Sequence, residues 1–382
     1  MLFTAESQLS HISLHCVQCG ASFPANMLIL QCDRCQSPLD VFYEVITSQS
    51  PPRDLSARQM PIPMHDESAG VTLGEGDTPV VLLPKVGQLL GSERIYGKLE
   101  FLNPTGSFKD RGTATLISVA LEHGVKEIVE DSSGNAGASI AAYSARAGIK
   151  AHIFAPADAP SSKIRQIKVY GGEAHLIAGP REAATEAAVD FYQKNNLLYA
   201  SHNLSPYFVE GTKAFAYEVL KQFGDGLPDH IVMPVGNGSL FIGAWKGFQE
   251  LKAGGHIKDI PTLHCVQAQA VRPIVDAFEG LEWSIKNVQQ TVAGGISVGN
   301  PPRLQQVVSI IHATGGQAVA VSESEILRWH GLLSAQEGIY AEPTSAAAFA
   351  GVESLIKQGH IKRDEVTLVP ITGFGLKDTA EY

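Results

Sequence analysis

The strongest constraint on the fold is an alternation of two patterns that begins near Val71. Short apolar runs rich in β-branched residues, such as 151–154 and 175–178, alternate with stretches of helical periodicity. The run at 231–235 leads into a glycine-rich turn and then a helical pattern over 241–251. This order predicts an α/β fold with parallel sheets whose two faces are covered by helices.

Length and composition limit the class of protein. A chain of 382 residues suits two or three domains, and 44% hydrophobic residues with 18% charged residues supply an ample core. No apolar run is long enough to span a bilayer, and the first ten residues lack the basic and apolar regions of a secretion signal. A net charge of −10 argues against binding to nucleic acid or to an anionic membrane. We therefore expect a cytoplasmic protein that acts on a small molecule.

Four of the five cysteines form two close pairs near the N-terminus. Cys16 and Cys19 are separated by two residues, as are Cys32 and Cys35, and the two pairs lie close together in the sequence. Four thiolates at this spacing can surround one tetrahedral zinc ion. Disulfides are the competing interpretation, but nothing else in the chain has secreted character. We expect a structural zinc that stabilises a segment of about forty residues with few large apolar groups.

One lysine lies in a segment suited to covalent chemistry. Residues 103–112 read Asn-Pro-Thr-Gly-Ser-Phe-Lys-Asp-Arg-Gly, and a helical pattern follows over 113–123. The turn brings Lys109 to the start of this predicted helix between small and aromatic neighbours. A partly desolvated ammonium loses its proton more easily, so Lys109 could form an imine with an aldehyde cofactor.

Three further segments have the pattern of ligand-binding loops. The segment 131–139 follows an apolar run and opens a helix of small residues at 140–147, which suits a carboxylate at a helix N-terminus. Gly236 to Leu240 follow a strand-like run and precede a helix, an arrangement that presents unpaired N–H groups to a phosphate. Near the C-terminus, residues 368–378 read Leu-Val-Pro-Ile-Thr-Gly-Phe-Gly-Leu-Lys-Asp.

These four segments, in this order, resemble those of the fold type II pyridoxal-phosphate enzymes, and of threonine synthases in particular. The resemblance covers roughly residues 71–378, with weaker matches at 74–79, 210–213 and 342–346. Some threonine synthases also carry a similar N-terminal zinc ribbon. The resemblance implies a homodimeric lyase that converts O-phospho-L-homoserine and water to L-threonine and phosphate.

The resemblance also implies a role for each matched position. Lys109 would hold pyridoxal phosphate and act as the general base, and Thr372 would hydrogen-bond the pyridine nitrogen. Asn135 would contact the ring hydroxyl of the cofactor. The cofactor phosphate would bind the loop of Gly236, Asn237, Gly238 and Ser239. The amino-acid substrate would contact Ser132, Ser133, Asn135, Ala136 and Phe208.

The sequence departs from the threonine synthase pattern where the substrate phosphate would bind. Phe208 stands where these enzymes commonly carry an arginine, Ala136 where a threonine is usual, and Phe374 where a histidine is usual. An apolar site does not bind a dianion well without a compensating cation. The candidate replacements are Lys163, Arg165 and Lys168, although a solvated helix face also accounts for them.

Three interpretations therefore remain. The chain is a threonine synthase with a rearranged phosphate site, or it eliminates ammonia or replaces a β-substituent on a non-phosphorylated amino acid. A non-catalytic zinc-ribbon protein is the third, and the intact Lys109, Asn135, Gly236 and Thr372 speak against it.

The domain organisation follows from the same comparison of segments. We expect a zinc-ribbon module at 1–47 and a linker at 48–70 rich in proline, serine and arginine. The resemblance implies two doubly wound domains with the cofactor between them. The large domain would comprise 71–112 and 206–382, and the small mobile domain 113–205.

Overall fold

The computed structural model describes residues 12–43, 60–64, 66, 70–159, 161–179, 181–224 and 226–378. Residues 1–11 and 44–47 of the predicted ribbon module, and most of the predicted linker (48–59, 65 and 67–69), lie outside this described part. The chain divides into two compact units. The first comprises Met1–Arg53, Gln59–Glu75 and Lys109–Ala214, and the second comprises Asp54–Arg58, Gly76–Phe108 and Phe215–Tyr382.

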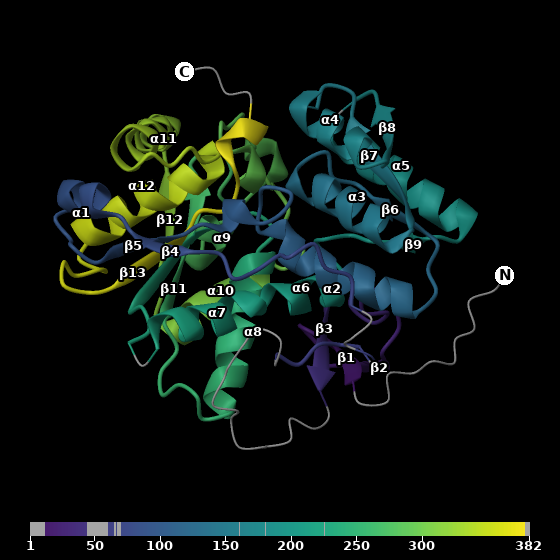
Figure 1. Cartoon of the computed structure of the whole chain (residues 1–382), viewed down its shortest axis with the longest axis horizontal. Coiled ribbons are helices and arrows are strands. Elements are labelled where there is room, and N and C mark those ends of the chain that lie inside the picture. Colours follow the sequence, from purple (N-terminus) through teal and green to yellow (C-terminus); the bar gives the residue numbers. More distant parts are fainter. Residues whose placement is uncertain are drawn as a thin grey trace. The chain divides into compact units, whose positions relative to one another are not determined.

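The first unit contains a parallel sheet and a small antiparallel sheet (Figure 1). The parallel sheet has the strand order β8-β7-β6-β9, and the antiparallel one has the order β2-β1-β3. The strands are β1 (Ile12–Cys16), β2 (Ser22–Pro24), β3 (Leu39–Tyr43), β6 (Glu127–Glu130), β7 (Lys150–Pro156), β8 (Glu173–Ile177) and β9 (Leu198–Tyr199). The helices are α2 (Lys109–Glu122), α3 (Asn135–Ala147), α4 (Ser161–Val169), α5 (Arg181–Asn195) and α6 (Pro206–Thr212).

The N-terminal antiparallel sheet shares the core of this unit. Its buried side chains, Leu14 and Leu39 among them, belong to the same cluster as residues of α2 and α3. Tyr43 on β3 donates a hydrogen bond of 2.8 Å to Glu210 on α6, and Glu210 forms a fully buried ion pair of 2.6 Å with Lys213. A hydrogen bond to a buried charge fixes this sheet against α6.

The second unit is built on a six-stranded sheet with the order β12-β11-β10-β13-β5-β4, in which only β4 is antiparallel to its neighbour. Its strands are β4 (Val80–Leu82), β5 (Ile95–Lys98), β10 (His230–Pro234), β11 (Thr262–Ala268), β12 (Ala318–Val321) and β13 (Thr367–Pro370). Its helices are α1 (Pro84–Leu90), α7 (Ala214–Phe223), α8 (Ser239–Ala253), α9 (Pro273–Phe278), α10 (Leu304–Thr314), α11 (Glu323–Glu337) and α12 (Pro343–Lys357).

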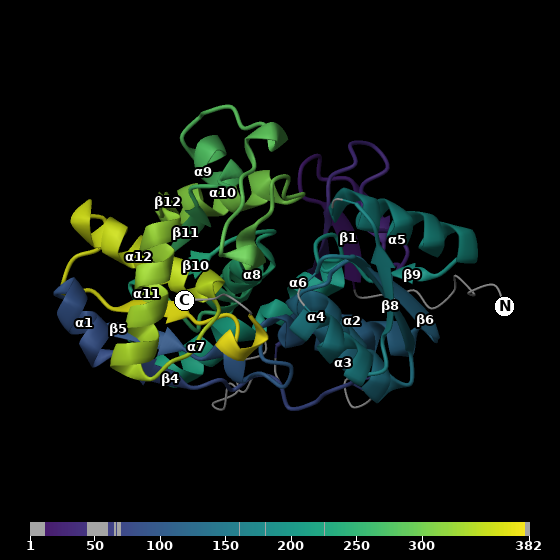
Figure 2. The same cartoon turned by 90° about the horizontal axis from the view of Figure 1, so that it is seen from above.

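Helices α11 and α12 lie side by side in this unit (Figures 1 and 2). With α1 and the apolar side chains of the central strands, they form one continuous buried core. A Cβ atom at Gly351 of α12 would lie 2.3 Å from Val266 on β11, so this helix can approach the sheet closely only because it carries a glycine there.

The predicted α/β class is confirmed, and the apolar runs at 151–154, 175–178 and 231–235 form the strands β7, β8 and β10 within a residue or two. Two helices begin earlier than predicted. Helix α2 starts at Lys109 rather than at residue 113, and α3 starts at Asn135 rather than at residue 140. Both added turns contain glycine, whose low helix propensity is overridden here by tertiary packing.

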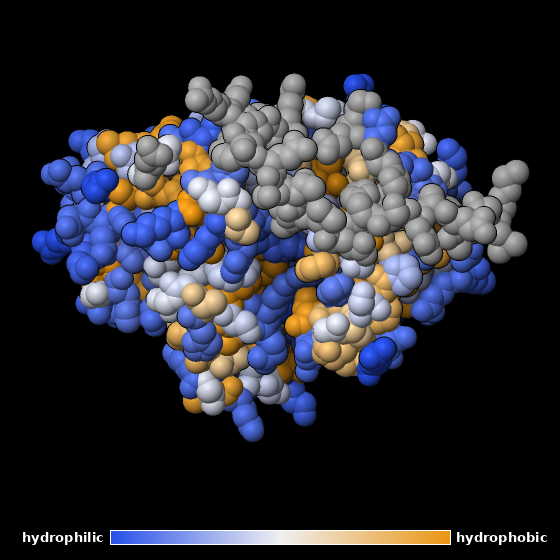
Figure 3. All heavy atoms as spheres, turned by 90° about the horizontal axis from the view of Figure 1, so that it is seen from below, coloured by the Kyte–Doolittle hydropathy of each residue, from blue (hydrophilic) through white to orange (hydrophobic). Residues whose placement is uncertain are grey.

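Figure 3 shows hydrophilic and apolar residues interspersed over the described part of one face of the molecule. Within the residues that the structure describes, no helix has both the length and the apolar character needed to cross a bilayer.

Candidate active site

Lys109 is the first residue of α2 and, in the sequence, the first residue of the segment Lys109–Ala214 of the first unit. In the first unit its Nζ lies 5.9 Å from the ring centroid of Phe208, which is fully buried on α6. A Cβ atom at Gly112 would come within 2.6 Å of this ring, so only glycine allows Phe208 to pack against α2. The amine therefore lies beside an aromatic face, at the edge of a closely packed core.

The loop before α3 belongs to the same unit. Ser132 is buried, and its Oγ accepts a hydrogen bond of 3.3 Å from the backbone N–H of Gly134. Gly134 is the N-cap residue of α3 and has no side chain to bind the first-turn N–H groups. Such N–H groups, at the positive end of a helix, suit a carboxylate. The predicted substrate positions Ser133, Asn135 and Ala136 lie in this loop and first turn.

In the second unit, β10 leads through a glycine-rich loop into α8. Gly238, the N-cap residue of α8, has φ 87°, and a Cβ there would lie 2.6 Å from Val307. A Cβ at Gly236 would meet the carbonyl oxygen of Gly295 at 3.1 Å. The conformation of Gly238 thus requires glycine, and Gly236 leaves little room for a side chain. The loop brings Asn237 and Ser239 to the N-terminus of a fifteen-residue helix.

Thr372 follows β13 in the same unit and is almost fully buried. Its hydroxyl lies 3.1 Å from Ser345 Oγ at the start of α12, and Ser345 Oγ accepts the N–H of Gly373 at 3.2 Å. Either hydroxyl of this pair can be the donor, and Ser345, whose oxygen already accepts the N–H of Gly373, can donate to Thr372. Thr372 can then donate its own proton to a third group. Sequence reasoning included Ser345 only in a weakly matching segment.

The two loops of the second unit lie at one edge of the sheet, because β10 and β13 are adjacent parallel strands. The backbone N–H of Phe108, the residue before Lys109, donates to the carbonyl oxygen of Thr372 at 3.1 Å. Beside it, Ser107 Oγ is fully buried and has no hydrogen-bond partner among the described residues. Three groups of this unit fit a phosphorylated pyridine cofactor: the N-terminus of α8, which suits an anion, the buried hydroxyl of Thr372, and the unsatisfied hydroxyl of Ser107.

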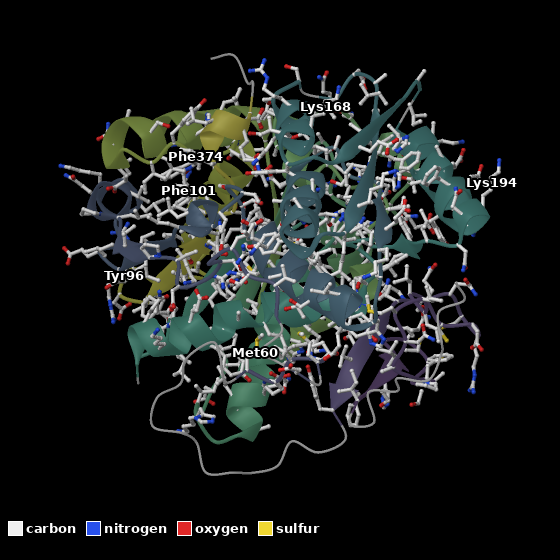
Figure 4. The ribbon with its side chains drawn as sticks, turned by 45° about the vertical axis from the view of Figure 1, so that its right-hand side comes forward. Met60, Tyr96, Phe101, Lys168, Lys194 and Phe374 are labelled. Carbon is white, nitrogen blue, oxygen red and sulfur yellow. The ribbon has the colours of Figure 1, made fainter. Side chains whose placement is uncertain are left out.

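Phe374 has a local structural role. Its ring stacks on that of Phe101, with centroids 5.4 Å apart and planes 13° apart. Both side chains are labelled in Figure 4. An aromatic pair of this kind contributes about 0.5–1.5 kcal/mol beyond burial. Phe374 thus packs against its own unit at the position where the threonine synthase pattern carries histidine.

Sequence reasoning missed a buried acid–imidazole pair in the first unit. Glu130 ends β6, and its Oε1 lies 2.6 Å from Nδ1 of His202. The His202 ring meets Phe208 edge to face, with centroids 6.1 Å apart. Burial raises the pKa of Glu130 well above its usual range and lowers the pKa of His202 well below its own. Both shifts favour the uncharged forms.

Three charged groups act on this pair. The charges of Lys109 and Arg181 lower the pKa values of both Glu130 and His202, while the charge of Asp131 raises the pKa of Glu130. Arg181 is the first residue of α5, the helix whose Thr185 donates a hydrogen bond of 2.7 Å to Asp131. The two cations and one anion leave a net positive charge around the pair, and nothing in the sequence pattern had indicated Arg181.

The three cations suggested by the sequence, Lys163, Arg165 and Lys168, all lie on α4. Arg165 and Lys168 are exposed, and Lys163 is half-buried. Arg165 and Lys168 thus have the burial of a solvated helix face.

The four N-terminal cysteines converge. Sγ of Cys16 lies 3.4 Å from that of Cys35, and Sγ of Cys19 lies 3.6 Å from that of Cys32, with all four within 4.8 Å of one another. These separations exclude disulfide bonds and are close to the roughly 3.8 Å expected between sulfurs around a tetrahedral zinc. Four sulfurs are the number of ligands that a tetrahedral structural zinc site needs.

Comparisons with known proteins agree with this arrangement. The family described as "Pyridoxal-phosphate dependent enzyme" matches residues 71–373. The threonine synthase of Methanocaldococcus jannaschii is 35% identical over 376 residues, which cover 95% of this chain and 92% of that protein. That of Methanosarcina acetivorans is 34% identical over 377 residues, covering 96% of this chain and 92% of that protein.

Solved structures show the same fold. A fungal L-serine ammonia-lyase from Rhizomucor miehei superimposes with a TM-score of 0.69 at 20% identity, covering 78% of this chain and 94% of that one. Threonine deaminase isoform 2 from Solanum lycopersicum superimposes with a TM-score of 0.67 at 21% identity, covering 78% of this chain and 79% of that one. The chain therefore belongs to the family of pyridoxal-phosphate-dependent enzymes, and its similarity to threonine synthases extends over nearly its whole length.

Proposed function

We propose that this chain is a threonine synthase, a lyase that converts O-phospho-L-homoserine and water to L-threonine and phosphate. The observation that carries the proposal is the similarity to curated threonine synthases over 95% of the chain, with a lysine in the matching motif at position 109. Solved structures at about 20% identity contribute the fold alone.

The cofactor would be held by the positions that the resemblance assigns to it. The N–H groups at Gly236 to Ser239 would hold its phosphate, Thr372 would hydrogen-bond its ring nitrogen, and Asn135 would contact its hydroxyl. When bound, pyridoxal phosphate supplies an electron sink for charge that develops at the substrate α-carbon. A neutral hydroxyl such as Thr372, itself oriented by Ser345, does not enforce protonation of the ring nitrogen, so the sink is moderated.

The remaining steps belong to this chain's own side chains. Ser132, Ser133 and the first-turn N–H groups of α3 would bind the substrate carboxylate. The amine of Lys109, beside the Phe208 ring, would remove and return protons at the substrate carbons. Phe208 excludes water from one side of that amine, because its ring is fully buried.

The substrate phosphate needs a cation that Phe208 does not supply. We assign this role to Arg181, since its field and that of Lys109 reach the same buried pair, Glu130 and His202. A dianion close to this pair would meet the charges of two cations and one anion, which sum to a net positive charge.

The alternative is ammonia elimination or β-replacement on a non-phosphorylated amino acid, which the apolar Phe208 beside Lys109 favours. A direct assay separates the two. The purified holoenzyme is incubated with O-phospho-L-homoserine, L-serine or L-threonine, and phosphate, threonine, ammonia and keto acid are measured. Equimolar phosphate and threonine from the first substrate support the proposal, and keto acid and ammonia from the others without release of phosphate would contradict it.

We propose further that Cys16, Cys19, Cys32 and Cys35 bind one structural zinc. The zinc proposal is supported by sulfur separations of 3.4 and 3.6 Å.

The homodimer and the cytoplasmic location implied by the resemblance are also proposals. Sedimentation of the purified protein tests the homodimer.

Cys16→Ser is expected to lower the tightly held zinc by one equivalent per chain, as measured by mass spectrometry of the metal after brief treatment with EDTA. The N-terminal sheet should become more sensitive to protease, while the visible absorbance of the bound cofactor should persist. Cys265→Ser is the matched control, because Cys265 is buried on β11 in the other unit. Unchanged zinc in Cys16→Ser would contradict the proposal.

A further inference from the structure

A second cluster of potential metal ligands lies in the first unit, on the parallel sheet. His152 is on β7, and Glu173 and His175 are on the adjacent edge strand β8 (Figure 1). Nδ1 of His152 lies 3.1 Å from Nε2 of His175, and the carboxylate oxygens of Glu173 lie 3.6 Å and 3.7 Å from these two nitrogens. Two imidazoles and a carboxylate thus converge on one point.

The orientation of His152 is fixed by a fourth residue. Its other nitrogen, Nε2, lies 3.0 Å from the carboxylate of Glu127 on β6. A carboxylate accepts hydrogen bonds, so Nε2 carries the ring proton and Nδ1 presents its lone pair toward His175. A carboxylate on the far nitrogen is the usual partner of a metal-binding histidine, because it fixes the tautomer and raises the basicity of the ligand.

The rings are held in place by aromatic packing. Phe154 stacks on His175 with centroids 4.4 Å apart, and Phe191 of α5 lies 4.9 Å from His152 and 5.4 Å from His175. The His152 side chain is only 4% exposed, whereas those of His175 and Glu173 are 24% and 50% exposed. The cluster is therefore rigid on its inner side and open to solvent on its outer side.

We propose that His152, His175 and Glu173 form a zinc-type divalent metal site that cross-links β8 to β7, with water completing the coordination. Two nitrogens 3.1 Å apart can both lie about 2 Å from one cation, the usual zinc–nitrogen distance, and each has a Glu173 oxygen within 4 Å. Binding needs the lone pair of His175 Nε2, so its ring proton shifts to Nδ1 through solvent, and no net proton is released.

The charges around the cluster suit a dication. Lys150 lies 3.0 Å from Glu173 and 4.0 Å from Glu127, so the two carboxylates and this one ammonium leave a net negative charge. Glu127 and Glu173 begin their strands, so the cluster lies toward the amino ends of the sheet. The loop before α3 follows the carboxyl end of β6, and the proposed site is therefore separate from that loop.

The test is a zinc titration of the holoenzyme whose cysteine site is already filled. Brief treatment with EDTA removes weakly held metal, and calorimetry then follows the uptake of added Zn²⁺. One further equivalent is expected for the unmodified protein and none for His175→Ala. Glu127→Gln should keep that equivalent but bind it roughly 10- to 100-fold more weakly. His360→Ala, at an exposed histidine of the second unit, should behave as the unmodified protein.

A spectroscopic measurement distinguishes the two sites. With ¹¹³Cd²⁺ in place of zinc, a sulfur-bound and a nitrogen/oxygen-bound ion give separate resonances, and only the latter should disappear in His175→Ala. Retention of cofactor absorbance by the variant shows that it is folded. Absence of a second equivalent in the unmodified protein, or its persistence in His175→Ala, would overturn the proposal.

Discussion

Replacing Lys109 with alanine is expected to reduce turnover by several orders of magnitude. The substitution removes the amine that we assign to cofactor binding and to proton transfer, and two roles lost together cost more than either alone. The visible absorbance of the covalently held cofactor should be lost as well, and borohydride treatment followed by peptide mapping should label Lys109 in the unmodified protein. The packing of α2 should survive, because Lys109 is only half-buried at its first residue.

Lys126→Ala is a suitable control, since Lys126 is an exposed lysine of the same unit that follows α2. It should retain both the absorbance and the activity. If the borohydride label were found on a different lysine, or if Lys109→Ala kept its visible absorbance, the assignment of Lys109 would be wrong.

Much of the fold was predictable because its signals are local. Each parallel strand is a short apolar run, and the loops that follow β6, β10 and β13 are marked by glycine and small polar residues. The sulfurs of the cysteine cluster could be expected to converge, since four ligands at that spacing have few other arrangements. The starts of α2 and α3 were predicted too late, because packing such as that of Gly112 against Phe208 is not local information.

The missed site residues share a physical reason. Glu130 and His202 are 72 residues apart in the sequence, and Ser345 and Thr372 are 27 apart. Such pairs exist only through tertiary contacts: β6 pairs with β9 close to His202, and the start of α12 packs against the loop after β13. A glutamate at the carboxyl end of the short strand β6 was the one available signal, because an acid in such a place is rarely fully buried without a partner.

The position of Phe208 changes the question of how phosphate is recognised. The Phe208 ring lies beside both Lys109 and His202 and packs on Gly112. It is therefore a structural part of the first unit, and it also stands where threonine synthases commonly carry an arginine. An arginine at this position would bring a second cation beside Lys109 in a buried setting, where like charges repel strongly. A cation that acts from the solvent side avoids this repulsion, and Arg181 at the start of α5 is exposed.

Arg181→Ala is therefore expected to raise KM for O-phospho-L-homoserine by about 10- to 100-fold, the usual contribution of a hydrogen bond to a charged group. The kcat value should change less, because the cation would bind the substrate phosphate equally in the ground state and in the transition state. Arg181→Lys should recover part of the loss, since a lysine keeps the charge but not the bidentate geometry.

The matched control is Arg165→Ala, at an exposed arginine of α4 in the same unit. It should leave KM unchanged if Arg181 is the phosphate-binding cation. A rise in KM in Arg165→Ala but not in Arg181→Ala would transfer the role to α4. If neither variant altered KM while O-phospho-L-homoserine was still turned over efficiently, the phosphate would be held without either arginine, and the positive field around Glu130 and His202 would serve another purpose.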